Sequence, residues 1–185
     1  MKIISIQRGY RIEAIDGPTL PITDEVIHKM MDPLDLNRSK IIIGAQSVEE
    51  LLEFIISNHF FPPKIKNEKK TDFESQILTS EWCSFAAKLR LVLFIVESKG
   101  LLEKTQKNEF EKLVRKAMEY RNAFAHGTFS TDGRKVKISY FKAKPVSKII
   151  DDDWLTEIEN NLSNCITQCH NISAMISTPI ELPDC

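Results

Sequence analysis

An arginine and a histidine five residues apart are the side chains of this sequence best suited to chemistry on a phosphate. They are Arg121 and His126, in the stretch Tyr120-Arg121-Asn122-Ala123-Phe124-Ala125-His126-Gly127. Arginine presents a planar fork of donors that matches a phosphate and stays charged. Histidine titrates near neutral pH, so it can take a proton from a ribose 2′-hydroxyl or return one to a leaving group. Together the two could cleave RNA without a metal ion and leave a cyclic phosphate.

The hydrophobic pattern around the arginine makes its position unusual. Between Asn108 and Ala125 the apolar residues recur with the spacing of one helix face. On a helical wheel of about 100° per residue, Arg121 falls in the middle of that stripe. A buried guanidinium is costly unless something pairs with it. We therefore expect Arg121 either to be paired within the fold or to be kept for a function.

Helix geometry limits how the pair can act together. Five residues correspond to a rotation of about 140°, so Arg121 and His126 do not share a face of a regular helix. If Gly127 ends the helix, His126 lies at the helix terminus and its ring can turn. Alternatively, the pair meets its counterparts from a second copy across a two-fold interface. Asn122 adds a polar group that could orient the ring or a phosphate oxygen.

A purely structural interpretation accounts for the same residues. The helix dipole favours a histidine at a helix C-terminus, and a nearby arginine can bond the last carbonyl groups. In that case Arg121 and His126 would cap and pair within a protein that has a structural or interaction role.

The elements that position the pair are predicted to form a mainly α bundle of four to five helices. The sequence predicts helices from Ser47 to about Phe61, from after Thr79 to Gly100, from Asn108 to His126, and from Asp151-Asp152-Asp153 to about Ile176. Ser47 with Glu50, and Asn108 with Glu111, are read as capping boxes. A β-hairpin is expected before the last helix, with strands at 128–131 and 136–141 around the Asp132-Gly133 turn.

The two ends of the chain differ from this bundle. Residues 1–45 are predicted to be an arm or small subdomain, 46–177 the bundle, and 178–185 a tail. Within the arm we expect short strands at 3–6 and 10–15, a helix at 23–31 ended by Asp32-Pro33, and a β-branched run at 41–43.

Composition narrows the classes of function. The 185 residues carry a formal net charge of −1. This argues against charge-driven binding of nucleic acid over a broad surface but allows a local phosphate site. No apolar run is long enough for a membrane span or a signal peptide, so a cytoplasmic protein is expected. A metal site of Cys165, Cys169 and His170 lacks a fourth ligand, and reduced core thiols are preferred. We expect no cofactor and no metal.

Arg121-Asn122-x-x-x-His126, followed by Gly127 at the end of a bundle helix, resembles the signature of HEPN domains. That signature is an arginine, four to six further residues and a histidine, often with a polar residue directly after the arginine. The resemblance covers roughly residues 47–176. Its most specific part is 121–133, where a hairpin follows the motif as in uncharacterised bacterial members of the family.

The resemblance implies an α-helical bundle that dimerises and brings two Arg–His pairs into one cleft. Many HEPN domains are metal-independent endoribonucleases that act as toxins or in phage defence, and many are held by an antitoxin partner. By this likeness Arg121 would hold the scissile phosphate, His126 would be the general base or acid, and Asn122 would support them. One subgroup has a tyrosine two residues after the histidine that an antitoxin modifies. Here that residue is Thr128, so this control is not expected.

Two further points remain open at the level of sequence. Other HEPN members are inactive, so the alternative function is a non-catalytic bundle that binds nucleotide, RNA or a protein partner. The hairpin cations Arg134, Lys135 and Lys137 could extend a phosphate site, although a charged, solvent-facing strand edge is the favoured interpretation.

Overall fold

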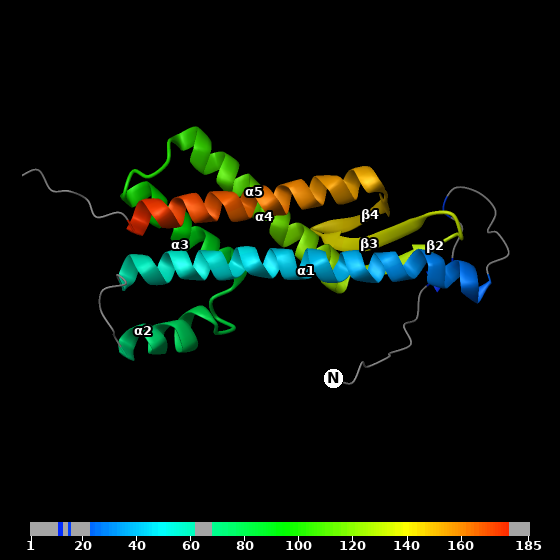
Figure 1. Ribbon diagram of the computed structural model, residues 1–185, viewed down its shortest axis with the longest axis horizontal. Coiled ribbons are helices and arrows are strands. Elements are labelled where there is room, and N and C mark those ends of the chain that lie inside the picture. The colour runs from blue at the N-terminus through cyan, green and yellow to red at the C-terminus, as the bar shows by residue number, and fades with distance from the viewer. Residues whose placement is uncertain (1–10, 13–14, 16–22, 62–67, 178–185) are drawn as a thin grey trace, which may run out of the picture.

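The computed structural model describes residues 11–12, 15, 23–61 and 68–177, which form a mainly helical protein with one small sheet (Figure 1). The expected strand at 3–6 and the tail at 178–185 lie outside the described residues. The helices are α1 (Asp24–Phe60), α2 (Glu68–Phe73), the π-helix η1 (Glu74–Leu78), α3 (Phe85–Ser98), α4 (Lys104–His126) and α5 (Asp152–Ser177).

Helix α1 is a single element of 37 residues, and our expectation for this region was wrong. The predicted helix at 23–31, the stop at Asp32-Pro33 and the separate helix from Ser47 are all parts of α1, and the predicted domain boundary between 45 and 46 falls inside it. Pro33 removes one backbone donor but does not end the helix. The buried side chains of Leu34, Ile41 and Ala45 join the same core as the later part of α1. This tertiary packing outweighs the local stop signals.

The starts of α3 and α4 also differ from the predicted ones. Helix α3 begins after Ser84, whose Oγ accepts a hydrogen bond from the backbone N–H of Ala87 at 3.3 Å. In α4 the backbone N–H of Glu103 donates to Oε1 of Gln106 at 3.0 Å, so the helix begins at Lys104 and not at Asn108. Both helices therefore begin where a side chain satisfies an otherwise free backbone group.

The three long helices form the body of the protein. In Figure 1, α1 and α5 lie side by side, and α4 crosses them at an angle behind. The contact between α4, α5 and the sheet is aromatic: the Phe124 ring lies 5.6 Å from Trp154 and 6.1 Å from Phe129 between centroids. Such offset aromatic contacts fix the end of α4 against its neighbours.

The sheet has the strand order β1-β2-β3-β4 and carries the predicted hairpin. Strand β1 (Arg11–Ile12) pairs in parallel with β2 (Thr128–Thr131), which pairs antiparallel with β3 (Val136–Lys142). Gly133 adopts a φ of 87° in the turn, as the Asp-Gly pair predicted. Strand β4 (Lys144–Ile150), antiparallel to β3, was not expected. It places Pro145 in an edge strand, where the missing N–H is tolerated.

No helix within the described parts of the chain has the length and apolar character needed to cross a membrane.

Candidate functional site

The side chain of Arg121 is exposed, which overturns the expectation that it occupies a buried position. The predicted stripe is correct for the first part of α4, where Phe110, Val114 and Ala117 are buried. In the last turns the buried side moves to Tyr120, Ala123 and Phe124, because this part of the helix packs on Trp154 and on the sheet. Arg121 therefore lies beside the new contact surface and reaches solvent.

Another arginine performs the capping that the structural interpretation gave to Arg121. Nη2 of Arg38, on α1, donates to the carbonyl oxygen of Ala125 at 3.1 Å, and its guanidinium lies 5.3 Å from the centre of the Phe129 ring. Among the described residues, no carboxylate forms an ion pair with Arg121. Its guanidinium is thus not used to hold the helix end.

Helix α4 ends at His126, as predicted, but Gly127 has a different role from the one expected. Its backbone is extended (φ −69°, ψ 151°) and not left-handed. A Cβ atom at this position would lie 2.3 Å from the carbonyl oxygen of Ala123 and 2.8 Å from Cγ1 of Ile138. Gly127 is needed because strand β3 passes so closely. His126 is exposed at the last position of the helix.

Asn122 bonds one candidate catalytic residue and lies on the same side of the helix as the other. Its Oδ1 accepts a hydrogen bond from Nη1 of Arg121 at 3.3 Å. It also stands four residues before His126, a spacing that puts the two on one face of a helix. The three predicted site residues therefore share the exposed surface at the end of α4, with Asn122 in the middle.

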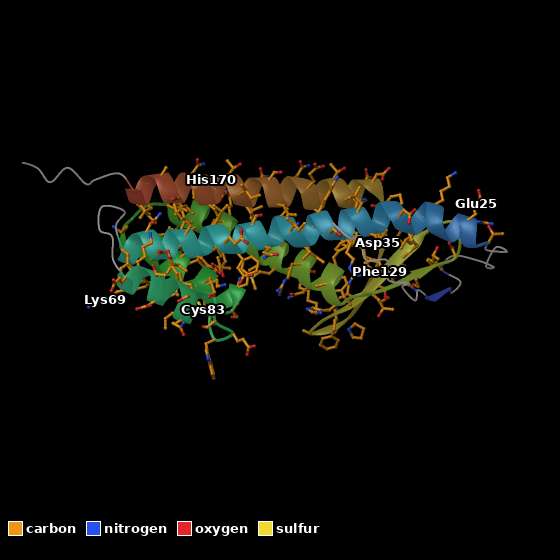
Figure 2. The ribbon with its side chains drawn as sticks, turned by 60° about the horizontal axis from the view of Figure 1, so that its bottom comes forward. Glu25, Asp35, Lys69, Cys83, Phe129 and His170 are labelled. Atoms are coloured by element: carbon orange, nitrogen blue, oxygen red, sulfur yellow. The ribbon has the colours of Figure 1, made fainter. Side chains whose placement is uncertain are left out.

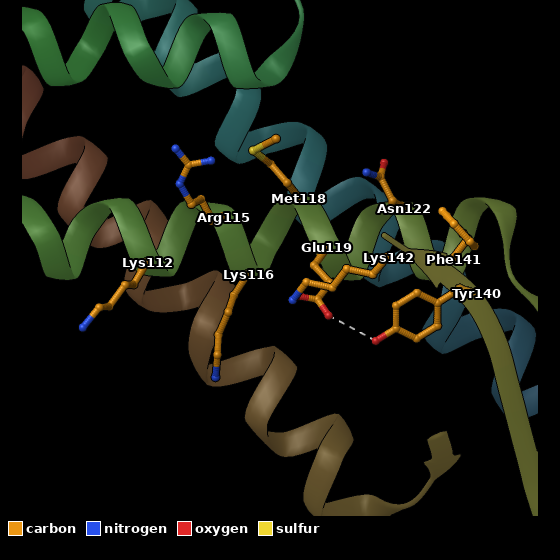
Figure 3. Close-up of a pocket in the computed structure, with 9 residues that line it drawn as sticks. All are labelled: Lys112, Arg115, Lys116, Met118, Glu119, Asn122, Tyr140, Phe141 and Lys142. Atoms are coloured by element: carbon orange, nitrogen blue, oxygen red, sulfur yellow. Dashed lines mark hydrogen bonds and ion pairs between the residues drawn. The ribbon is translucent and has the colours of Figure 1, made fainter. Parts of the chain in front are cut away.

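Asn122 also lines a groove of about 520 Å³ between α4 and the end of β3 (Figure 3). In Figure 3, Arg115 and Asn122 project from one side of α4 and Lys112 and Lys116 from the other. The lining comprises four cations, one carboxylate, two aromatic residues, Asn122 and a methionine: Lys112, Arg115, Lys116, Met118, Glu119, Asn122, Tyr140, Phe141 and Lys142.

Carboxylates position most of these cations. Arg115 pairs with Glu111, and Lys116 pairs with Glu157 of α5, with Nζ 2.8 Å from Oε1. Hydrogen bonds from Lys116 and then Tyr120 are the largest causes that lower the pKa of Glu157.

On the strand side, Lys142 and Tyr140 both bond Glu119, with Tyr140 Oη 3.2 Å from Oε1. Lys112 makes no ion pair or hydrogen bond with its side chain to the described residues.

The groove was missed by sequence reasoning. The i, i+4 spacing of Lys112 and Lys116 does put these two lysines on one side of a helix, whereas Arg115 projects from the other side. Nothing in the sequence indicates that Phe141 and Lys142 of β3 pack beside them. The hairpin cations do not join this site, because Arg134 and Lys135 follow the turn at the opposite end of β3 from Phe141 and Lys142.

The cysteines behave as core residues. Cys165 and Cys169 are fully buried, and burial raises the pKa of each thiol to about 12. His170 lies on the exposed side of α5 (Figure 2), away from the buried thiols. His170 therefore does not face the two thiols, and the three residues suggested as metal ligands do not converge on one point.

No protein-family model, no curated protein and no solved structure matches this chain.

Proposed function

We propose that the protein is a metal-independent endoribonuclease of the HEPN type, acting as a toxin or phage-defence effector. The observation that carries the proposal is the exposed group at the end of α4, in which Asn122 bonds Arg121 and shares a helix face with His126. A cation-lined groove beginning at Asn122 supports a polyanionic substrate.

The proposed reaction is transfer of the phosphodiester to the neighbouring 2′-oxygen. His126 accepts the proton of the ribose 2′-hydroxyl, the 2′-oxygen bonds to phosphorus, and the bond to the 5′-oxygen breaks. A protonated His126 returns a proton to that 5′-oxygen, so that the products are a 2′,3′-cyclic phosphate and a 5′-hydroxyl. Arg121 stabilises the charge on the phosphate oxygens, as a fixed donor fork does.

A homodimer completes the proposed site. One His126 then serves as base and the partner subunit's copy as acid, which explains how residues about 140° apart on one helix act together. Exposed apolar side chains support an association surface: Leu36, Ile43 and Phe54 recur on one side of α1, and Ile43 is 61% exposed.

The test is cleavage of a fluorescent RNA by the purified protein in the presence of EDTA. We expect cleavage by the wild type and a loss of 100-fold or more in Arg121→Ala and His126→Ala, the range in which charge stabilisation and proton transfer contribute. Arg90→Ala and His170→Ala, both exposed and remote, are matched controls that should retain activity. Equal rates in all five proteins would refute the assignment.

The biological role has its own test. Expression in a bacterial host should arrest growth, and Arg121→Ala or His126→Ala should restore it. Growth arrest that persists in both variants would show that toxicity does not depend on the proposed chemistry.

A second function, a non-catalytic bundle that binds a protein partner, is favoured by one observation. The side chain of Trp82 is 94% exposed and that of Phe94 is 64% exposed, although aromatic residues of this size are usually buried. If no RNA is cleaved, a binding role through these exposed aromatic residues is the function to test.

A further inference from the structure

We infer that the groove between α4 and β3 is a binding track for the single-stranded RNA that flanks the cleaved bond, with Phe141 as a platform on which a base stacks. The inference rests on the proposed function, because the groove would bind the part of the RNA substrate next to the cleavage site. It adds four cations and an aromatic residue, none of which belongs to the Arg–His motif.

The charge of the groove suits a chain of phosphates. Its lining holds four cations and the carboxylate of Glu119, and Glu111 and Glu157 pair with two of these cations from outside the lining, so the cations exceed the carboxylates by one. Ion pairs with Glu111, Glu157 and Glu119 hold Arg115, Lys116 and Lys142 in place, and the donors of these cations that carboxylates do not occupy remain for phosphate oxygens. Lys112 contributes a cation with no pairing partner among the described residues. Local clustering of this kind is what a short phosphate track needs.

The exposed ring of Phe141 indicates that the ligand has unpaired bases. Its side chain is 74% exposed at the end of β3, where its neighbour across the sheet is Pro145. A buried phenylalanine stabilises a fold, whereas a solvent-facing one beside cations offers a flat surface on which a base can stack. Bases within a duplex are already stacked on each other, so the platform selects a single strand.

The groove meets the candidate site at one residue. Asn122 belongs to both, since it lines the groove and accepts the hydrogen bond from Arg121. From Asn122 back to Lys112 the helix rises by roughly 15 Å at 1.5 Å per residue, which is room for a few nucleotides. A strand placed in the groove therefore leads a phosphate to Arg121 and His126.

An acidic peptide is the competing ligand for a cationic groove. It would also meet the lysines, but it gains nothing from a flat ring that faces solvent unless it carries an aromatic residue. The combination of spaced cations with one exposed ring, next to a phosphate-directed pair, favours the nucleic acid.

The experiment measures binding of a fluorescent 12-nucleotide RNA by anisotropy, over a series of salt concentrations. All variants carry His126→Ala so that the probe is not cut. Phe141→Ala is expected to weaken binding about tenfold, a loss typical of one stacked base, with an unchanged salt dependence. Lys112→Ala is expected to reduce the slope of log K against log salt by about 0.7, the value for one lost phosphate contact on a single strand.

Two control variants remove the same groups elsewhere. Trp82→Ala deletes an aromatic residue that is 94% exposed, and Lys40→Ala deletes an exposed cation of α1 outside the groove. Both should bind the probe as the parent protein does. Every variant is first checked for folding by circular dichroism, and all four positions are exposed, so native spectra are expected.

The outcomes separate this inference from the proposed function. If the wild type cleaves RNA but Phe141→Ala and Lys112→Ala bind like the parent, the track is refuted and the ribonuclease stands. If the wild type does not cleave, but both variants lose affinity as stated, the track stands and the catalytic proposal fails. Displacement of the RNA by poly-glutamate but not by unlabelled single strand, or equal affinity for a duplex, would also refute the track.

Discussion

At the scale of single residues, the accessibility of Arg121 and the position of Asn122 decide what the end of α4 can do. Arg38 bonds the carbonyl of Ala125, so the helix end does not need Arg121. Asn122 then holds the free guanidinium by its amide oxygen and leaves its charge intact. A neutral acceptor suits a phosphate-binding arginine better than a carboxylate, which would neutralise it.

The difference between a neutral and a charged acceptor for Arg121 can be tested by two substitutions at position 122. Asn122→Ala removes the orienting bond, and we expect the cleavage rate at saturating RNA to fall about tenfold. Asn122→Asp keeps an oxygen for Arg121 but adds a negative charge beside the scissile phosphate, so a larger loss and a raised KM are expected. Initial rates over a range of RNA concentrations measure both effects. Equal activity of the aspartate variant and the wild type would contradict the role given to Asn122.

A second residue-scale prediction concerns the buried cation of α3. Lys88 is 5% exposed, with Nζ 2.6 Å from Glu49 Oε1 and 2.5 Å from Glu53 Oε1. Burial works against its charge, but the bonds and charges of the two carboxylates outweigh it, and the pKa of Lys88 is raised. Lys88→Met leaves two carboxylates without their partner and should lower the free energy of unfolding by about 3 kcal/mol.

Urea denaturation measures this loss, with Arg90→Met on the exposed side of α3 as the control. Adding Glu49→Gln and Glu53→Gln to Lys88→Met should restore part of the stability, because the unpaired charges are removed. If Lys88→Met is as stable as Arg90→Met, the ion pairs do not support the contact between α1 and α3.

At the scale of elements, the junction between α4 and β2 fixes the site. The chain leaves the helix at His126 and enters the sheet at Thr128, so Gly127 alone makes the connection. Its backbone passes so close to Ala123 and Ile138 that a side chain does not fit. The position of His126 therefore depends on the contact between the helix end and β3.

Gly127→Ala tests this junction. The added Cβ would meet a backbone oxygen that has no room to move, and we expect a loss of about 2 kcal/mol in the free energy of unfolding. Gly44→Ala is the control: its Cβ would lie 3.0 Å from the flexible tip of Leu162, and alanine favours the helix. Thermal melts should show a lower Tm for Gly127→Ala only, and matching melts would contradict the packing described here.

The elements show how far the sequence predicts this fold. The hairpin, α5 and the end of α4 at His126 were correctly predicted, because each is marked by local signals such as the Asp132-Gly133 turn. The length of α1 was not, since Pro33 is a local stop signal that burial of Leu34 and Ile41 overrides. Strand β4 was missed because proline, which lacks an N–H, argues against a strand unless that strand is known to lie at an edge of the sheet.

For the candidate site, the sequence named the residues at the end of α4 but not their exposure or the groove beside them. The motif named Arg121, Asn122 and His126, and the structure gathers them at one helix end. The expected burial of Arg121 was wrong, because a helical wheel assumes that one face is buried along the whole helix. The groove depends on which strand packs beside α4, and this is a tertiary contact that no local pattern encodes.

At the scale of the whole molecule, the proposed function requires two copies. We expect the protein to sediment as a dimer of the 21.2 kDa chain. Ile43→Asp places a charge in the exposed apolar row of α1, so it should shift the protein toward the monomer. The rate of RNA cleavage should fall in proportion to the loss of dimer. Analytical ultracentrifugation at several concentrations checks this. A wild-type protein that is monomeric while it cleaves RNA would remove the need for a second His126.

The chemistry of the RNA ends is the most direct measurement of the central claim. A short RNA is incubated with the wild-type protein in EDTA, and the products are identified by mass spectrometry. We predict a 2′,3′-cyclic phosphate on one fragment and a 5′-hydroxyl on the other, and neither product with His126→Ala. Fragments that carry a 3′-hydroxyl and a 5′-phosphate, or the same products from the histidine variant, would contradict the account.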